Sequence, residues 1–404
     1  MNVGVPGETA PGESRVALVP PVAGKLVDRG IDVRVAAGAG ADATWTDAQY
    51  REAGCEVLDD RSEVFGRSDV VLQVRGLGAN PDAPDDPYRE GQVVVGLLGP
   101  YGLDAGDRST LVDRGLTAFA LELIPRTGRA QSMDVLTSMA SVAGYKAAVL
   151  AADTLPKLFP MQMTAAGTVR PAEVFVVGAG VAGLQAIATA RRLGASVRAY
   201  DIRPAVREEV QSLGAEFVDL ELETEAAADE SGYARELEEA FYRRQRETMT
   251  RVVAEADVLI TSAAVPGRPS PELVSGAMIE GMDDGSVVVD LGAEGGGNCE
   301  PTRPDETVEY AGVTVLGPTN LPGRVSHTAS RLFSNNATDF LLYLLEDGEL
   351  AIDTGDEIVD ATLLAHEGTV RHPRTDDEGD DAEDSDGTNG ASGPGDRNPG
   401  VGSG

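Results

Sequence analysis

One stretch of the chain spaces glycines and an acidic residue as a dinucleotide-binding turn requires. Four apolar residues, 174–177, precede a glycine-rich hexapeptide, and Asp201 follows after a helix-like segment and a second strand-like segment, 196–200. This order predicts a strand, a tight turn, a helix to about Leu193, and a second strand that ends at an acid. The turn consists of Gly178, Ala179, Gly180, Val181, Ala182 and Gly183.

Each of these residues has a physical task at such a site. Gly178 allows the tight turn, Gly180 allows the backbone to approach a pyrophosphate, and Gly183 allows the helix to pack close to the strand. The unpaired N–H groups of the helix N-terminus attract phosphate. Asp201 can accept hydrogen bonds from both adenosine ribose hydroxyls and would repel a 2′-phosphate, which favours NAD(H) over NADP(H). Ile202 and Arg203, directly after it, belong to the expected site; the alternative is a purely structural glycine turn.

The elements around this motif predict an α/β protein with two Rossmann-like, doubly wound parallel-sheet domains and a cleft between them. Strand and helix signals alternate along the chain, as in mostly parallel sheets covered by helices. We expect a discontinuous first domain, residues 1–133 plus 325–372, and an NAD(H)-binding Rossmann domain over 134–324. A long helical pattern over 133–159, ended by Pro156, connects them. The acidic tail 373–404 has almost no apolar residues and is expected to be disordered.

Composition excludes several classes of function. The 404 residues carry a formal net charge of −34, which disfavours a nucleic-acid partner. An excess of Asp and Glu with only three lysines resembles proteins of salt-loving microbes, so we interpret the charge as a means of solubility at high ionic strength; the alternative is a functional acidic surface. The two cysteines and three histidines lack metal-ligand spacing, so no metal site is expected. We expect a cytoplasmic protein, because neither a signal peptide nor an apolar run of membrane-spanning length is evident.

Three segments resemble a known family. They are Arg15-Val16-Ala17-Leu18, the run from Pro125 to Thr137 (PRTGRAQSMDVLT), and the run from Phe159 to Val169 (FPMQMTAAGTV) that leads into the glycine motif. With Gly232-Tyr233-Ala234 and Gly296-Gly297-Asn298-Cys299, they make the chain similar to the NAD(H)-binding alpha subunit, or domain I, of proton-translocating nicotinamide nucleotide transhydrogenase. The related alanine dehydrogenases share the fold but differ in the second segment.

The resemblance implies direct hydride transfer between NADH and NADP+ held on a partner subunit. Such transfer needs two nicotinamide rings held face to face, with no general acid or base. It implies catalytic roles for Arg126, Gln131, Asp134 and Thr137, the last standing where the family usually has serine. It also implies a mobile loop containing Gly232 and Tyr233. Ala264 follows a predicted strand whose carboxyl end should face NAD(H), and strand-end packing is an equal alternative for it. The alternatives are an ordinary Arg126–Asp134 interdomain ion pair, a surface Gln131 and a helix-capping Tyr233.

Two other functions are alternatives. An alanine dehydrogenase-like amino-acid oxidoreductase needs a lysine and a histidine, but Gln73, Arg75 and the run Gly99-Pro100-Tyr101 occupy the corresponding positions. The chain could also be a non-catalytic NAD(H)-binding module. The resemblance implies partner subunits that bind NADP(H) and span the membrane, with this chain a homodimer without membrane insertion of its own. It would then sit peripherally on the cytoplasmic face of the cell membrane.

Overall fold

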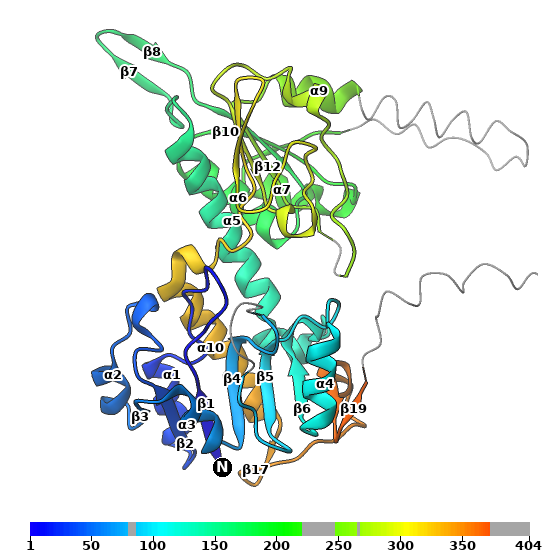
Figure 1. Cartoon of the computed structure of the whole chain (residues 1–404). Helices are drawn as coiled ribbons and strands as arrows, with labels where there is room; N and C mark the ends of the chain where they lie inside the picture. Colours follow the sequence, from blue (N-terminus) through cyan, green and yellow to red (C-terminus); the bar gives the residue numbers. More distant parts are fainter. Residues whose placement is uncertain (80–85, 220–246, 265–266, 372–404) are drawn as a thin grey trace, which may run out of the picture.

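The computed structural model describes residues 1–79, 86–219, 247–264 and 267–371. It consists of two α/β bodies, each built on one large sheet, which are joined by the long helix α5 (Val135–Thr154) (Figure 1). The predicted α/β class with two doubly wound parallel sheets is confirmed.

The first sheet has eight strands in the order β19-β18-β6-β5-β4-β1-β2-β3. Its six strands from β3 to β6 pair in parallel, whereas β18 and β19 are added antiparallel by the returning chain. The strands are β1 (Asn2–Val5), β2 (Asp32–Ala36), β3 (Glu56–Leu58), β4 (Val70–Arg75), β5 (Val93–Leu97), β6 (Thr117–Ala120), β18 (Leu363–His366) and β19 (Thr369–Val370).

Helices cover both faces of this sheet. One core contains α10 residues such as Phe333 and Phe340 packed with β1, β2 and β4, and the other contains Phe65, Tyr88 and Leu111. Thr46 forms a capping box with Gln49 at the start of α2. The helices are α1 (Pro20–Val27), α2 (Asp47–Glu52), α3 (Arg61–Gly66), α4 (Ala105–Asp113), α10 (Ser326–Tyr343) and α11 (Glu357–Thr362), with 3-10 turns η1 (Ala41–Ala43), η2 (Leu121–Leu123), η3 (Gly128–Met133) and η6 (Gly323–Val325).

The second sheet has seven strands in the order β11-β10-β9-β12-β13-β15-β14, and β14 alone of these is antiparallel. Without β14 this is the strand order of a dinucleotide-binding fold, with the order reversing between β9 and β12. The elements are β9 (Glu173–Val177), α6 (Val181–Arg192), β10 (Ser196–Tyr200), η4 (Pro204–Val206), α7 (Arg207–Ser212), β11 (Glu216–Phe217), β12 (Val258–Thr261), α9 (Gly276–Ile279), β13 (Val287–Asp290), η5 (Ala293–Gly295), β14 (Thr307–Tyr310) and β15 (Val313–Leu316). Residues 247–254 are also helical.

Helix α5 contributes residues to the cores of both bodies. Its first half, including Val135 and Met139, lies in the core of the first body, and Ala147 and Ala151 lie in the core of the second. It is the one described helix with the length and apolar composition to cross a membrane, but 39% of that window is buried, and a core helix passes the same test. The helix ends at Thr154, just before Pro156, as predicted.

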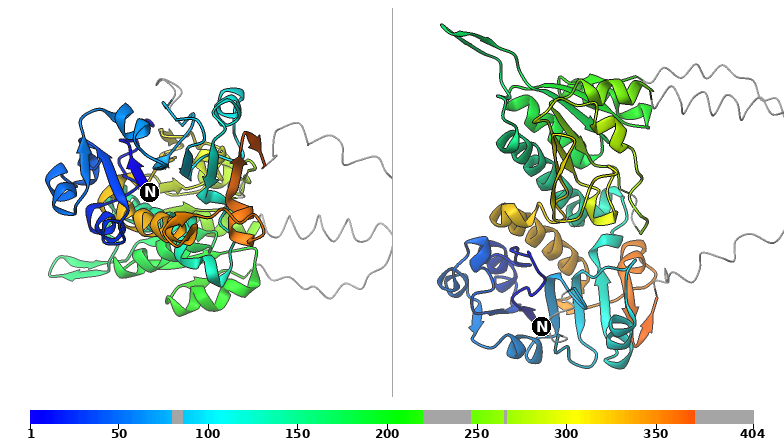
Figure 2. Two further views of the ribbon diagram at one scale, coloured as in Figure 1. Left: turned by 90° about the horizontal axis from the view of Figure 1, so that it is seen from below. Right: turned by 45° about the horizontal axis from the view of Figure 1, so that its top comes forward.

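A β-hairpin after α5 projects from the second body (Figures 1 and 2). It consists of β7 (Gln162–Thr164) and β8 (Gly167–Val169), which pair antiparallel and are exposed throughout. A second small hairpin, β16 (Leu345–Glu346) with β17 (Glu349–Leu350), follows α10. The sequence patterns predicted neither hairpin, and they also missed β3, α3, α4 and β14.

Candidate functional site

The glycine turn lies where the strand order of the second sheet reverses, between β9 and α6. Gly178 has a φ of +95°, a conformation that L side chains rarely adopt. A β-carbon on Gly183 would lie 1.8 Å from the Gly178 carbonyl oxygen, so this position has no room for a side chain. A β-carbon on Gly180, in contrast, would meet nothing closer than Arg203 Nη2 at 4.0 Å. The turn is therefore packed on its protein side and open above Gly180.

The start of α6 is free to receive an anion. Gly180 is the N-cap, and no side chain caps the first backbone N–H groups within the described chain. A helix N-terminus of this kind attracts phosphate through its N–H groups and its partial positive charge. The arrangement suits a pyrophosphate lying over the turn.

Asp201 follows β10 and is 8% exposed. Its Oδ2 accepts a 2.7 Å hydrogen bond from Ala179 N, and its Oδ1 accepts one of 2.8 Å from Arg203 N. The Arg203 guanidinium adds one hydrogen bond to each oxygen, both 2.9 Å. Burial opposes the charge, but the hydrogen bonds from Arg203 and Ala179 outweigh it and hold the pKa of Asp201 below its usual value. The neighbouring Ile202 is 80% exposed.

Asp290 at the end of β13 organises the opposite wall of the crevice. This fully buried carboxylate accepts five hydrogen bonds, from Thr261 Oγ1, Gly292 N, Asn298 N, Cys299 N and Thr302 Oγ1. The Asn298 side chain in turn accepts from Ala263 N at 3.0 Å and donates to Ala263 O at 2.8 Å. The loop that carries the exposed Ala264 is thereby fixed to the 292–297 glycine run.

Sequence reasoning missed the role of Asp290, because its partners come from three separate segments. The only local signal was an acid at the end of an apolar strand, directly before glycines. Cys299 lies in the same buried cluster, and burial raises the pKa of its thiol well above the usual value. Its chemistry is that of an inert core residue.

The first sheet has an equivalent crevice between β1 and β4, but acidic side chains fill it. Glu8 accepts hydrogen bonds from Val74 N at 2.7 Å and Arg75 N at 3.0 Å, and burial raises its pKa to about 8. Glu13 is likewise buried and binds Arg15 through both carboxylate oxygens, at 2.7 and 2.6 Å. Acidic side chains and their arginine partners therefore occupy the point of strand reversal in the first sheet, whereas the open glycine turn lies at that point in the second.

The 125–134 loop is anchored to the helices of the first body. Arg129 forms an ion pair of 2.7 Å with Asp356 and a short hydrogen bond with Tyr343, whose hydroxyl also donates to Asp356 at 2.7 Å. The Asn336 amide on α10 donates to the Ser132 carbonyl at 2.6 Å. These bonds fix the base of the loop without using the residues singled out from the sequence.

The four predicted loop residues fall into two groups. Arg126 and Gln131 are exposed, and neither side chain has a hydrogen-bond or ion-pair partner among the described residues. Asp134 is the N-cap of α5 and accepts hydrogen bonds from Thr137 N at 2.8 Å and Thr137 Oγ1 at 2.6 Å. The structure thus shows no Arg126–Asp134 ion pair within the part of the chain that it describes. The spacing of Asp134 and Thr137 was a capping signal that the sequence analysis overlooked.

Helix α5 links this loop rigidly to the glycine turn. It begins directly after Asp134, and its Gly144 packs against the turn, where a β-carbon would lie 2.0 Å from the Ala182 carbonyl oxygen. Ten residues of helix separate Asp134 from Gly144, which corresponds to about 15 Å. The loop and the phosphate-binding end of α6 are consequently held at a fixed separation by one helix.

The positions that an amino-acid dehydrogenase would use are differently engaged. Gln73 is buried and bonded to Tyr88 and Asp86 at 2.6 and 2.7 Å. Arg75 lies 3.4 Å from Glu13 and 3.9 Å from Glu294 of the second body. With Arg15 saturated by Glu13, neither arginine of this cluster stands free for a substrate carboxylate.

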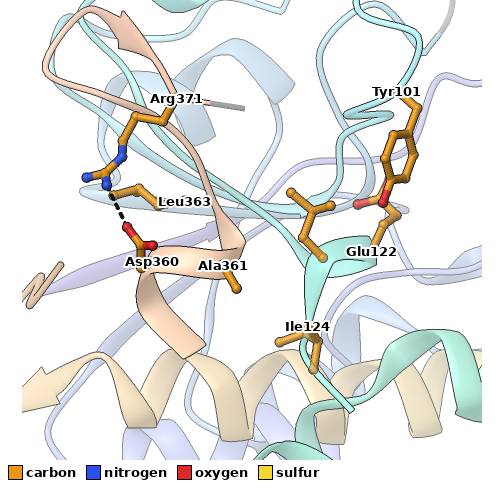
Figure 3. Close-up of a pocket in the computed structure, with 8 residues that line it drawn as sticks. Tyr101, Glu122, Ile124, Asp360, Ala361, Leu363 and Arg371 are labelled. Carbon is orange, nitrogen blue, oxygen red and sulfur yellow. Dashed lines mark hydrogen bonds and ion pairs between the residues drawn. The ribbon is translucent and has the colours of Figure 1, made fainter. Parts of the chain in front are cut away.

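A polar pocket of about 470 Å³ lies beside the 125–134 loop, between η2 and α11 (Figure 3). Leu123 and Ile124 line it immediately before the loop, and Asp360 and Arg371 face each other across 2.5 Å on the other side. Burial raises the pKa of Glu122, which accepts hydrogen bonds from Leu98 N and Gly99 N. None of the predicted site residues that the structure describes lines this pocket.

Some predictions lie outside the described residues. These are Gly232 and Tyr233 of the expected mobile loop, and the expected disorder of the 373–404 tail. Among the residues that are described, no group of three or more histidine, cysteine or acidic side chains is arranged to hold a metal.

Comparison with known proteins places this geometry in context. Residues 4–143 match the family described as Alanine dehydrogenase/PNT, N-terminal domain, and residues 147–373 match Alanine dehydrogenase/PNT, C-terminal domain. The chain is 41% identical over 378 residues to an NAD(P) transhydrogenase subunit alpha from Rhodospirillum rubrum, the first of the pieces into which that subunit is divided. The match covers 92% of this chain and 98% of that protein.

Two solved structures share the fold. A transhydrogenase from Sinorhizobium meliloti superposes with a TM-score of 0.82 at 42% identity, over 92% of this chain and all of that one. An L-alanine dehydrogenase superposes with a TM-score of 0.76 at 27% identity, over 92% of this chain and 97% of that one.

Proposed function

The chain belongs to the alanine dehydrogenase/PNT family, and from this premise we propose that it is the NAD(H)-binding subunit of a proton-translocating NAD(P) transhydrogenase. NADH binds across the carboxyl ends of β9 and β12. It passes a hydride directly to NADP+ held on a partner subunit, with the Re/Si stereospecificity of that enzyme class. The transfer is coupled to proton translocation by partner subunits that span the membrane, which keep this chain at the cytoplasmic face.

One observation supports this proposal most strongly. The open glycine turn and the 125–134 loop are joined by a single helix, and the loop exposes the side chains of Arg126 and Gln131, which could donate hydrogen bonds to a ligand. The pyrophosphate lies over Gly180, and the adenosine ribose is held by Asp201 beside Ile202 and Arg203. The nicotinamide end then points toward the 125–134 loop, at the distance that α5 fixes. Arg126 and Gln131 are exposed there and unpaired within the described chain, so both are available to a nicotinamide or to a second nucleotide.

The residues contribute positioning rather than proton chemistry. Hydride transfer needs the two nicotinamide rings at near-attack distance. In our proposal Arg126 binds a phosphate or carboxamide oxygen, and Gln131 bridges to the NADP(H) of the partner. Asp134 and Thr137 keep the first turn of α5 in place and anchor the carboxamide or ribose. Gly232 and Tyr233 close over the bound nucleotide, and Ala264 contacts it at the end of β12.

The residues at the positions that amino-acid oxidation would use, in the first body, disfavour this alternative function. No lysine or histidine occupies its keto-acid positions, and the nearby arginines are bound to Glu13. The proposal is tested by mixing the chain with the purified partner subunit, NADH and an NADP+ analogue. It requires that NADH reduces the analogue only when both proteins are present. The domain boundaries that accompany it remain 1–133 plus 325–372 and 134–324.

We also propose that the chain is a homodimer that uses the β7–β8 hairpin. The hairpin exposes Met161 by 61%, Met163 by 75% and Val169 by 43%. Apolar side chains gathered on a projecting element are typical of surfaces that another chain covers. On the adjacent helix α5, Leu136 and Tyr145 are also exposed.

Replacing Met161 and Met163 together with serine should convert the dimer into monomers. The change removes the largest apolar side chains of the hairpin, and the hairpin makes no contribution to either core. The mass in solution is measured by light scattering after size-exclusion chromatography. Val112→Ser is the control. It removes an apolar side chain that is 46% exposed on α4, in the other body, and should leave the mass unchanged. A double variant that stays dimeric would contradict this role.

A further inference from the structure

Groups of the chain itself occupy all the acceptor positions of Asp201. A carboxylate has about four lone-pair sites, and here four N–H groups fill them, two on each oxygen. Two of the four come from the backbone of Ala179 and Arg203 and are fixed by the turn. The other two come from the Arg203 guanidinium, with one hydrogen bond on each oxygen. A ribose diol brings two hydroxyl donors, which need the same two positions.

The Arg203 side chain has room to move away from Asp201, whereas the Asp201 side chain is enclosed. The Arg203 side chain is 57% exposed, and the Asp201 side chain is 5% exposed. The guanidinium also lies next to the open phosphate turn, because Arg203 Nη2 is 4.0 Å from where a Gly180 β-carbon would be. A small rotation of a long, exposed side chain takes it from the carboxylate to an anion over Gly180.

We propose that Arg203 is an exchangeable counter-ion. In the structure it occupies the positions on Asp201 that the adenosine ribose requires, and on dinucleotide binding it transfers to the pyrophosphate. This inference rests on the proposed NAD(H) site and adds a specificity-determining role for Arg203. A ligand with both ribose and pyrophosphate replaces the Arg203–Asp201 ion pair with a contact between Arg203 and the pyrophosphate. A ligand with the ribose alone does not.

The exchange predicts opposite effects on two ligands. In Arg203→Gln the competitor for Asp201 is absent, so adenosine should bind about three- to fivefold more tightly, the range expected of an exposed ion pair. The same variant lacks the phosphate contact, so NADH and ADP-ribose should bind about tenfold more weakly or worse. Arg203→Lys, which keeps a charge but cannot span both oxygens, should gain adenosine affinity and retain most NADH affinity.

The experiment titrates full-length wild type and variants with adenosine, ADP-ribose and NADH by isothermal calorimetry at one salt concentration. Arg207→Gln is the matched control, since Arg207 pairs with Asp219 and lies 4.8 Å from the centre of the Phe217 ring, and it makes no described contact with Asp201. It should leave all three affinities unchanged.

Opposite shifts for adenosine and NADH in Arg203→Gln support the exchange. Shifts in the same direction, or an unchanged adenosine affinity, overturn it while leaving the proposed function intact. A wild-type chain that binds neither NADH nor ADP-ribose overturns the proposed function itself.

Discussion

Replacing Gly183 with alanine should abolish NADH binding and destabilise the second body. Gly183 lies inside α6, where the backbone tolerates alanine, so the effect is purely steric. The new β-carbon would lie 1.8 Å from the Gly178 carbonyl oxygen, and both the turn and the helix must separate to admit it. Forcing an extra methyl group into a packed site costs about 1–3 kcal/mol, and more where backbone must move. Thermal unfolding and NADH titration measure the two losses.

Gly180→Ala is the matched control, because it adds the same methyl group two residues after the turn begins. Its β-carbon has open space, with no atom closer than 4.0 Å. We expect wild-type thermal stability with a reduced NADH affinity, since the methyl group occupies the path of the pyrophosphate. If Gly183→Ala binds NADH normally, or if Gly180→Ala does, the placement of the dinucleotide over this turn is wrong.

Replacing Gln131 with asparagine should slow hydride transfer by about 100-fold and leave NADH affinity nearly unchanged. The shorter side chain keeps the amide but withdraws it from the second nucleotide by one methylene, and a misplacement of about 1 Å can cost this much in rate. Gln131 is exposed, without a partner in the described structure, so its loss does not disturb the fold. Single-turnover measurements with the partner subunit give the transfer rate, and fluorescence titration gives the affinity.

Ser132→Ala provides the control for this loop. Ser132 is exposed and supplies only its backbone carbonyl to Asn336, so the variant should transfer hydride at the wild-type rate. A large loss of NADH affinity in Gln131→Asn with an unchanged transfer rate would refute the bridging role.

The nucleotide-binding unit was predictable because its information is local. The apolar run, the glycines and the acid predicted β9, α6 and β10 nearly to the residue, since steric limits at Gly178 and Gly183 leave few alternatives. Pro156 likewise located the end of α5. These features depend on neighbours within a few positions of the chain.

The features that were missed depend on distant partners. Asp290 acquires its five donors only when β12, β13 and the 292–302 segment come together. Strand β14 is antiparallel to β15, only four residues long and without a fully buried residue, so no strand pattern stood out. The hydrogen bonds between Arg203 and Asp201 were also missed, because the sequence motif describes the contact of the acid with a ligand and not its contacts within the chain.

Isotope transfer in a reconstituted reaction tests the central claim most directly. The purified chain is mixed, in high salt that screens its charge of −34, with the purified NADP(H)-binding partner, NADH deuterated at the transferring position of C4, and an NADP+ analogue. The account predicts that the analogue is reduced only when both proteins are present, and that the deuterium appears in the reduced analogue rather than in water. Failure to bind NADH together with no turnover, or oxidation of NADH by pyruvate and ammonia without the partner, would contradict it.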